Sequence, residues 1–379
     1  MIQNNTSYPK DSRRCVFSTG NDAYIPHAVV SLLSFKKFNP LFDVFILCTN
    51  ISGENRKLCT YCGIIPIEIN LSHTFYQQWQ YPKECYYHFK APEVFFSMGY
   101  EYSVYIDGDT YCAGKFSWES TPSFHIAGAS YNTIGDFFIE IGDYENVKAS
   151  FGLNEQSVFD RERIQSGVLI YNNRALLNSD YFNKAGYLFD RSIKENIPRK
   201  GDDSLLALIT LFYPELETFV VNLNYNFIDY INYASSGPIN NDLDGDVIAK
   251  CIVYHFINSK PWFLSDYYPN YPHKYFCYKW LEVMINNFSQ QDIKRCYPDF
   301  YKPDIIDSSK VKFYWFKSQP NFGDWITPYL YKKICGTEVQ FIDPLETDQN
   351  VIIATGSIMR LCGPNTIVWG SGIRDRYQD

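Results

Sequence analysis

Short apolar runs alternate with amphipathic stretches in the first part of the chain. Residues 15–20, 42–49 and 63–69 are apolar runs that predict strands, and FDVFILCT at 42–49 is continuous, as in a strand buried on both faces. Between these runs, 24–38 places apolar residues at helical spacing, and 53–63 can also form a helix. This order predicts the βαβαβ opening of an α/β sheet, in which ligands bind at the carboxyl ends of the strands.

The middle of the chain contains further predicted strands and one predicted helix. Strands are predicted at 103–109, 124–130, 166–173 and 251–256, and the first and last of these run into polar turns. A helix is predicted at 202–212, where two carboxylates precede a long apolar stretch. The pattern therefore predicts that the α/β arrangement extends to about residue 270.

The pattern changes at residue 271. The aromatic-rich stretch 271–308 predicts a helical connector, after which apolar runs return at 312–316, 351–356 and 366–372, with a glycine-ended helix at 323–336. This C-terminal stretch is too short to complete a doubly wound domain, so we expect a truncated lobe. The predicted organisation is a first domain, a connector and a partial α/β lobe, at 1–270, 271–308 and 309–379.

Composition and charge narrow the classes of function. With 46% hydrophobic and 20% charged residues the chain is typical of a globular protein, and its net charge of −8 argues against a nucleic-acid partner. The eleven cysteines are scattered, and Cys59 and Cys62 form the one close pair, so we expect reduced, mostly buried thiols. No stretch approaches the roughly 20 apolar residues of a membrane span. We therefore expect no transmembrane segment and a soluble, cytoplasmic protein, in the host cytoplasm if the source is viral.

The first candidate site is the sequence Tyr105-Ile106-Asp107-Gly108-Asp109. Two carboxylates one residue apart at the end of a buried strand can converge on one hard divalent cation, for which oxygen ligands suit Mg²⁺ or Mn²⁺. Gly108 allows a tight turn and the close approach of a ligand. By itself, this short motif is equally compatible with an acidic surface turn.

A second polar turn strengthens the metal hypothesis. His255 follows another apolar strand, and an imidazole suits Mn²⁺ better than Mg²⁺. Lys260, five residues further on, can meet a phosphate as a point charge. We therefore predict that Asp107, Asp109 and His255 hold Mn²⁺ or Mg²⁺, with Lys260 placed to meet a phosphate of a bound ligand.

Several segments between residues 14 and 265 resemble, in the same order, those of the family 8 glycosyltransferases. These segments are FSTGNDAYIPHAVVSLLSF, YYHFKAPEVF, VYIDGDT, IQSGVLIYNN, GDDSLLALI and HFINSKPW. The resemblance implies the GT-A fold, a Rossmann-like α/β fold with a mixed, mostly parallel sheet that binds a nucleotide-sugar. It also implies retaining transfer of a sugar from a UDP-sugar donor to a glycan or glycoconjugate acceptor.

The resemblance carries over to named residues. It implies donor binding by Thr19, Asn21, Asp22, Tyr24, Lys90, Asp107, Gly108 and Lys260. It also places Asp203, Asp202 and Gln165 at the reacting centre. Gln165 stands where the family has asparagine, Asp203 where it has the glutamine nearest the reacting carbon, and Ile257 where it has glycine. The Asp203 carboxylate could act as a nucleophile or alter acceptor binding.

The C-terminal segments NFGDWITPYL, ATGSI and VWGSGI resemble the start of polysaccharide pyruvyltransferases, over residues 311–375. This implies a longer, bifunctional protein of polysaccharide assembly, with an accessory βα unit lacking activity as the alternative. For the first domain, two other classes stay open. One is a non-catalytic nucleotide-sugar-binding module, and the other is a nucleotidyltransferase, because a metal-bound pair of carboxylates also suits phosphoryl chemistry.

Overall fold

A computed structural model describes residues 13–298, with gaps at 72–73, 76–81, 118–122, 153–155, 196, 198–200, 229–247, 258–259 and 263–270. Of the residues after 298, it describes four short strands. The chain divides into two compact units, Met1–Tyr297 and Pro298–Asp379.

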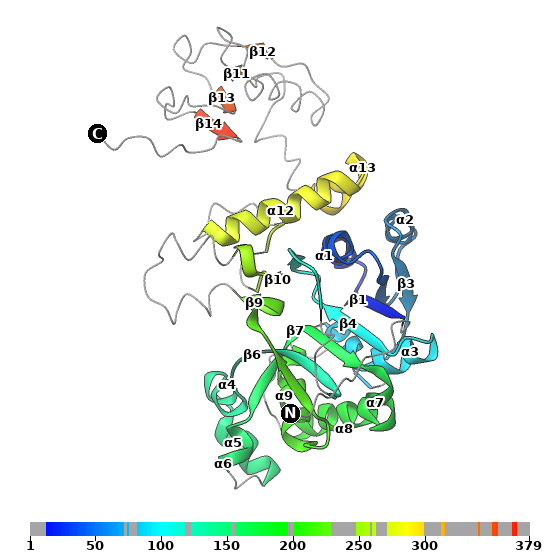
Figure 1. Ribbon diagram of the computed structural model, residues 1–379, viewed down its shortest axis with the longest axis vertical. Helices are drawn as coiled ribbons and strands as arrows, with labels where there is room; N and C mark the ends of the chain where they lie inside the picture. The colour runs from blue at the N-terminus through cyan, green and yellow to red at the C-terminus, as the bar shows by residue number, and fades with distance from the viewer. Residues whose placement is uncertain are drawn as a thin grey trace, which may run out of the picture. The chain divides into compact units, whose positions relative to one another are not determined.

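The first unit is built on a seven-stranded sheet with the order β3-β2-β1-β4-β7-β6-β8 (Figure 1). Its strands are β1 (Arg14–Gly20), β2 (Asp43–Cys48), β3 (Ile65–Glu68), β4 (Tyr102–Ile106), β6 (Ile126–Thr133), β7 (Glu162–Asn172) and β8 (Thr218–Val221). Neighbouring strands are parallel except β7, which runs antiparallel to both β4 and β6. The predicted mixed, mostly parallel α/β sheet is confirmed.

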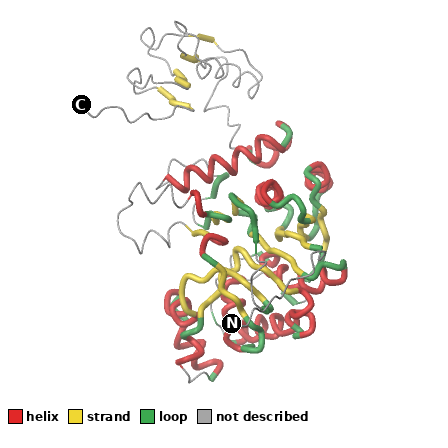
Figure 2. The backbone as a smooth tube through the Cα atoms, in the orientation of Figure 1, coloured by secondary structure: helices red, strands yellow, loops and turns green. Residues whose placement is uncertain are grey.

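The central strands form where the chain has continuous apolar runs. β1, β2 and β4 are buried along nearly their whole length, because helices cover the faces of the sheet (Figure 2). The helices of this part are α1 (Ile25–Phe38), α2 (Gly53–Tyr61), η1 (Lys83–Lys90), α3 (Ala91–Ser97), α4 (Ile134–Glu140), α5 (Tyr144–Phe151), α6 (Gln156–Phe159), α7 (Asn173–Asn178), α8 (Tyr181–Lys194) and α9 (Gly201–Phe212). α1, α2 and α9 confirm the predicted helices.

A small second sheet positions the candidate site. It has the order β5-β10-β9, with β5 (Thr110–Cys112), β9 (Phe227–Ile228) and β10 (Val253–His255). β10 pairs antiparallel with β5, which places His255 opposite Thr110. Since β5 begins directly after Asp109, this pairing brings the second predicted turn onto the first. The sequence pattern predicted β10 but neither β5 nor β9.

The helices of the expected connector lie within the first compact unit. They are α12 (Tyr271–Asn287) and α13 (Gln290–Cys296), and α12 packs on α1. Trp280 of α12 is fully buried, with its ring 5.6 Å from that of Trp262. The helices themselves were predicted, but their packing places the end of the first unit beyond residue 270.

The second unit contains a four-stranded parallel sheet with the order β12-β11-β13-β14. Its strands are β11 (Lys312–Tyr314), β12 (Gln340–Phe341), β13 (Val351–Ala354) and β14 (Thr366–Trp369). Three of them confirm predicted strands, and the helix predicted at 323–336 lies outside the described residues. Among the described parts of both units, no helix has the length and apolar character needed to cross a membrane.

The packing of α12 predicts where the first unit can be cut. We expect limited proteolysis to cleave after Tyr297 and release a folded fragment, whereas a fragment ending at residue 270 should be unstable. Without α12, the buried rings around Trp262 would be exposed, and loss of one large buried aromatic side chain costs about 3–5 kcal/mol. Urea unfolding of chains 1–297 and 1–270 checks this. Equal stability of the two would show that α12 adds nothing to the unit.

Candidate metal and nucleotide site

The turn after β4 aims two carboxylates at one point. The backbone of Asp107 is fixed by its N–H, which donates to the carbonyl of Gly167 at 2.9 Å. A side chain at Gly108 would overlap the ring of Tyr24 and lie 3.2 Å from the backbone nitrogen of Ala28. Glycine is therefore required here because helix α1 approaches the turn closely, which extends the predicted role of this residue.

His255 completes a group of three potential metal ligands. Its Nε2 lies 3.3 Å from Oδ2 of Asp107 and 3.3 Å from Oδ1 of Asp109. One ligand atom from each residue lies within 4.8 Å of the others. The opposite ring nitrogen, Nδ1, lies 3.1 Å from Oδ1 of Asn226. A partner on this nitrogen fixes the orientation of an imidazole and leaves Nε2 to face the carboxylates.

The group also has the chemistry that a hard divalent ion requires. Two carboxylates and an imidazole suit Mn²⁺ or Mg²⁺, whose bonds to oxygen are about 2.0–2.6 Å long. Ligand atoms within 4.8 Å of one another can therefore reach one shared ion with small side-chain adjustments. The three side chains therefore fit the divalent metal ion that the sequence predicts.

The three ligands strongly perturb one another. Burial raises the pKa of Asp107, and Asp109 adds to this against the opposing effect of His255. Burial also acts to raise the pKa of Asp109, but Lys260 and His255 outweigh it and hold that pKa below its usual range. Burial acts to lower the pKa of His255, but the two carboxylates outweigh it and raise the pKa. The two carboxylates thus favour positive charge beside them, which His255 and Lys260 can supply.

Lys260 lies in the same cluster. Its ammonium group donates to the Asp109 carboxylate and to the carbonyls of Phe256 and Ile257, the last two at 2.8 Å. The carbonyls belong to the turn after β10, so the turn itself holds the lysine. The structure thus places Lys260 beside the potential metal ligands, and its predicted contact with donor phosphates stays a prediction.

An aromatic stack supports the loop that carries Lys260. Trp262 lies parallel to His27 of α1, with ring centroids 3.7 Å apart. Nδ1 of His27 lies 3.0 Å from the hydroxyl of Tyr297, and burial lowers the pKa of His27 to about 3. A neutral imidazole is therefore stacked on the indole, and both ends of the first unit contribute to the support of this loop.

Two of the residues predicted at the reacting centre act here through neighbours. Oε1 of Gln165 accepts from Nδ2 of Asn226 at 2.6 Å, and Asn226 in turn contacts His255. Oδ2 of Asp202 lies 3.1 Å from Nε2 of His88, which is completely buried. Neither residue belongs to the group of potential ligands: Gln165 reaches His255 through Asn226, whereas Asp202 contacts His88.

The residues predicted to bind the donor are divided between the cluster and structural roles. Thr19 lies 3.5 Å from the hydroxyl of Tyr105, and Tyr24 packs under Gly108. Asn21 accepts from the N–H of Tyr24 at 3.2 Å, and Asp22 accepts from Ser52 N–H and Asn55 Nδ2, both at 2.8 Å. Lys90 pairs with Glu93 and lies over the Phe182 ring. The structure therefore does not bring Lys90 to the ligand cluster.

Sequence reasoning missed several residues that shape the site. Tyr105 donates its hydroxyl hydrogen to the Asp107 carboxylate. Gly167 leaves room for the His255 ring, because any side chain at this position would overlap it. A glycine inside an apolar strand signals such a close approach, so Gly167 could have been found from the sequence. Asn226 lies in the 3-10 helix η2 (Leu223–Asn226) and carries no comparable signal.

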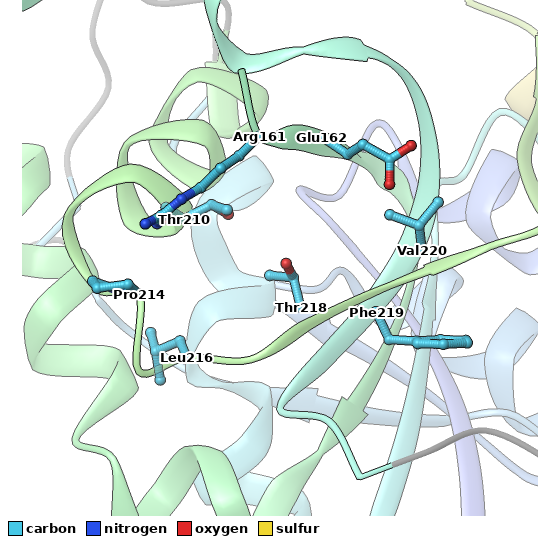
Figure 3. A pocket seen from close by; sticks show the side chains of 8 residues that line it. All are labelled: Arg161, Glu162, Thr210, Pro214, Leu216, Thr218, Phe219 and Val220. Carbon is cyan, nitrogen blue, oxygen red and sulfur yellow. The ribbon is translucent and has the colours of Figure 1, made fainter. Parts of the chain in front are cut away.

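Two pockets of about 570 and 510 Å³ lie elsewhere, along the edge strand β8. Figure 3 shows the larger one, with Arg161 and Thr210 opposite Glu162 and Val220. Glu162 and Val220 line both pockets, and neither pocket includes a residue of the ligand cluster.

The contact between Tyr105 and Asp107 predicts a measurable effect on metal affinity. Loss of a neighbour that orients a ligand typically weakens metal binding by about 10- to 100-fold. We expect Tyr105→Phe to weaken Mn²⁺ binding by this amount, as measured by calorimetric titration. Tyr100→Phe is the matched control, because the Tyr100 hydroxyl donates to Asp43 at 2.7 Å, and Asp43 is not part of the cluster. Equal affinities for both variants would show that Tyr105 does not orient Asp107.

The fold of the first unit is that of the GT-A glycosyltransferases. Two solved structures of the galactosyltransferase LgtC are similar: an active-site mutant with glutamate in place of glutamine, and a complex with donor and acceptor sugar analogues. They are 17% and 18% identical to this chain, with TM-scores of 0.56 and 0.54, and each match covers 75% of this chain and 99% of LgtC. The bifunctional glycosyltransferase WbbM is 14% identical, with a TM-score of 0.54, over 77% of this chain and 53% of its own.

These similarities establish the fold, and the structural neighbours are glycosyltransferases. No protein-family model matches the chain, and no curated protein sequence matches it significantly. None of the three structures gives support to the resemblance of residues 311–375 to a pyruvyltransferase.

Proposed function

We propose that this protein is a metal-dependent glycosyltransferase of the family 8 type. It would transfer a sugar from a UDP-sugar to a glycan or glycoconjugate acceptor with retention of configuration. The observation that carries this proposal is the convergence of Asp107, Asp109 and His255, from two different sheets, within 4.8 Å in a GT-A fold. Lys260, bound to one of these carboxylates, adds a positive charge at the same place.

In this proposal each residue of the cluster has a definite role. Asp107, Asp109 and His255 would hold Mn²⁺ or Mg²⁺, which when bound neutralises the charge of a departing nucleotide diphosphate. Lys260 would add a second positive charge toward the same phosphates. Gly108 would permit close approach of the donor, and Tyr24 and Thr19 lie directly beside this turn.

The residues further from the cluster would position it. Gln165 supports His255 through Asn226, and Asp202 is held by His88. Asn21 and Asp22 tie the loop after β1 together, and their predicted contacts with the nucleoside remain part of the proposal. We propose no pyruvyl transfer for the chain.

A panel of nucleotide-sugars tests the function directly. UDP-glucose, UDP-galactose, UDP-N-acetylglucosamine and UDP-glucuronate are incubated with the protein in Mn²⁺, in Mg²⁺ and in EDTA, and released UDP is measured. We expect release of UDP from at least one donor in the presence of metal and none in EDTA. Tight binding of a donor without turnover would instead favour a binding module. Transfer of the UMP group, with release of a sugar 1-phosphate in place of UDP, would favour a nucleotidyltransferase.

A further inference from the structure

Asp203 is held in place by contacts on one of its two oxygens. Oδ1 accepts from the backbone N–H of Ser166 at 2.9 Å and lies 3.2 Å from Nη1 of Arg163. The other oxygen, Oδ2, has no hydrogen bond or ion pair with the described residues, and the side chain is 23% exposed. The carboxylate therefore meets its partners among the described residues through one oxygen alone.

The N–H of Ser166 is available because strand β7 is irregular here. The pairing of β6 with β7 is irregular between Gly128 and Ser130 of β6. Gly128 pairs with Leu169 of β7, but Ser130 pairs with Ile164. The intervening residues of β7 are left out of the ladder with β6, and an unpaired N–H needs another acceptor. Asp203, at the start of α9, supplies it.

Arg163 is itself fixed before it meets Asp203. Its side chain is only 5% exposed, its Nε donates to Oδ1 of Asn132 at 3.0 Å, and its guanidinium group lies 4.3 Å from the centre of the Phe137 ring. A buried guanidinium group requires a negative partner, because an unpaired charge in this environment is strongly destabilising. Asp203 is the only acidic partner that Arg163 has among the described residues.

We propose that Arg163 is a positioning residue that holds Asp203 as a hydrogen-bond acceptor for an acceptor hydroxyl, and prevents it from acting as a covalent nucleophile. The proposal rests on the glycosyltransferase function proposed above. If Asp203 formed a glycosyl ester it would lose its charge, and Arg163 would be buried without a charged partner. That cost opposes a double displacement through Asp203 and leaves same-face transfer as the favoured route. Oδ2, which has no partner among the described residues, is able to accept a hydrogen bond from a sugar hydroxyl.

A double-mutant cycle tests the coupling through function. Arg163→Gln removes the charge while keeping a donor for Asn132, and Asp203→Gln removes the partner charge. In the wild-type background we expect Arg163→Gln to lower kcat/KM for the acceptor about tenfold or more, because breaking a buried ion pair is strongly unfavourable. UDP release in the absence of acceptor should change less than about twofold. In the Asp203→Gln background, Arg163→Gln should add little, since coupled residues give non-additive losses.

The readouts separate a positioning role from a merely structural one. The acceptors are the methyl glycosides of glucose, galactose and N-acetylglucosamine, and the one with the highest turnover is used throughout. Equal losses in both backgrounds, or a loss confined to the KM for the donor, would overturn the proposal. A glycosyl adduct on Asp203 of the wild-type protein, found by mass spectrometry after incubation with donor, would also overturn it.

Two additions keep the proposal testable if a variant or the enzyme assay fails. Arg163→Lys retains the charge and should recover most of the lost kcat/KM if Arg163→Gln folds poorly. If the wild-type protein turns over no donor, the proposed function has failed. The coupling between Arg163 and Asp203 is then measured by urea unfolding of the wild type, the two single variants and the double variant. Non-additive stabilities would support Arg163 as the group that holds Asp203, and additive stabilities would refute it.

Discussion

Asp109→Asn is expected to abolish metal-dependent turnover while leaving the protein folded. Asp109 contacts both His255 and Lys260. Replacing its carboxylate by an amide of the same size removes one potential metal ligand charge and weakens the ion pairs with these two residues. We expect UDP release to fall by about 10³-fold or more, on the scale of losing a main electrostatic stabiliser of a transition state. Mn²⁺ affinity, measured by calorimetric titration, should fall in parallel.

The control for this substitution is Asp43→Asn. Asp43 is also a carboxylate in an ion pair, with Arg13, but its side chain is 51% exposed and is not part of the ligand cluster. This variant should keep its turnover and its Mn²⁺ affinity. Thermal unfolding of both variants shows that the fold is intact. Turnover of Asp109→Asn at the level of Asp43→Asn would remove the metal site from the proposed function.

Lys260→Ala is expected to lower kcat more than it raises the KM for the donor. Negative charge develops on the leaving phosphates in the transition state, and only interactions that are stronger there accelerate the reaction. We expect a fall in kcat of about 10²-fold, with a smaller change in KM, from steady-state kinetics with the best donor of the panel.

Lys260→Arg provides the matched comparison. It keeps the charge but replaces a compact ammonium group by a planar fork, so it should retain part of the activity. Because Lys260 pairs with Asp109, each variant also needs a Mn²⁺ titration to show that the ligands still bind the ion. An increase in KM alone would make Lys260 a simple anchor for the donor and contradict its role in the transition state.

The apolar pattern predicted which segments form the strands of the sheet, but not their directions. The strands β1, β2 and β4 have continuous apolar sequences because they are covered on both faces. Their burial could therefore be predicted from the sequence. The pattern also predicted β7, but not that β7 would run antiparallel between β4 and β6. Strand direction depends on where the chain returns in space, which no local pattern records.

The same distinction holds for the site. The sequence by itself determined the available chemistry, because two carboxylates after one buried strand and an imidazole after another are potential metal ligands by their residue types alone. Tertiary structure alone decided that they meet: the pairing of β10 with β5 brings His255 to Thr110, next to Asp109. It also decided that Lys90 lies over the Phe182 ring, that α12 belongs to the first unit, and that Arg163 pairs with Asp203. Each of these is a contact between distant parts of the chain, and its energy depends on packing and burial that exist only once the whole unit has folded.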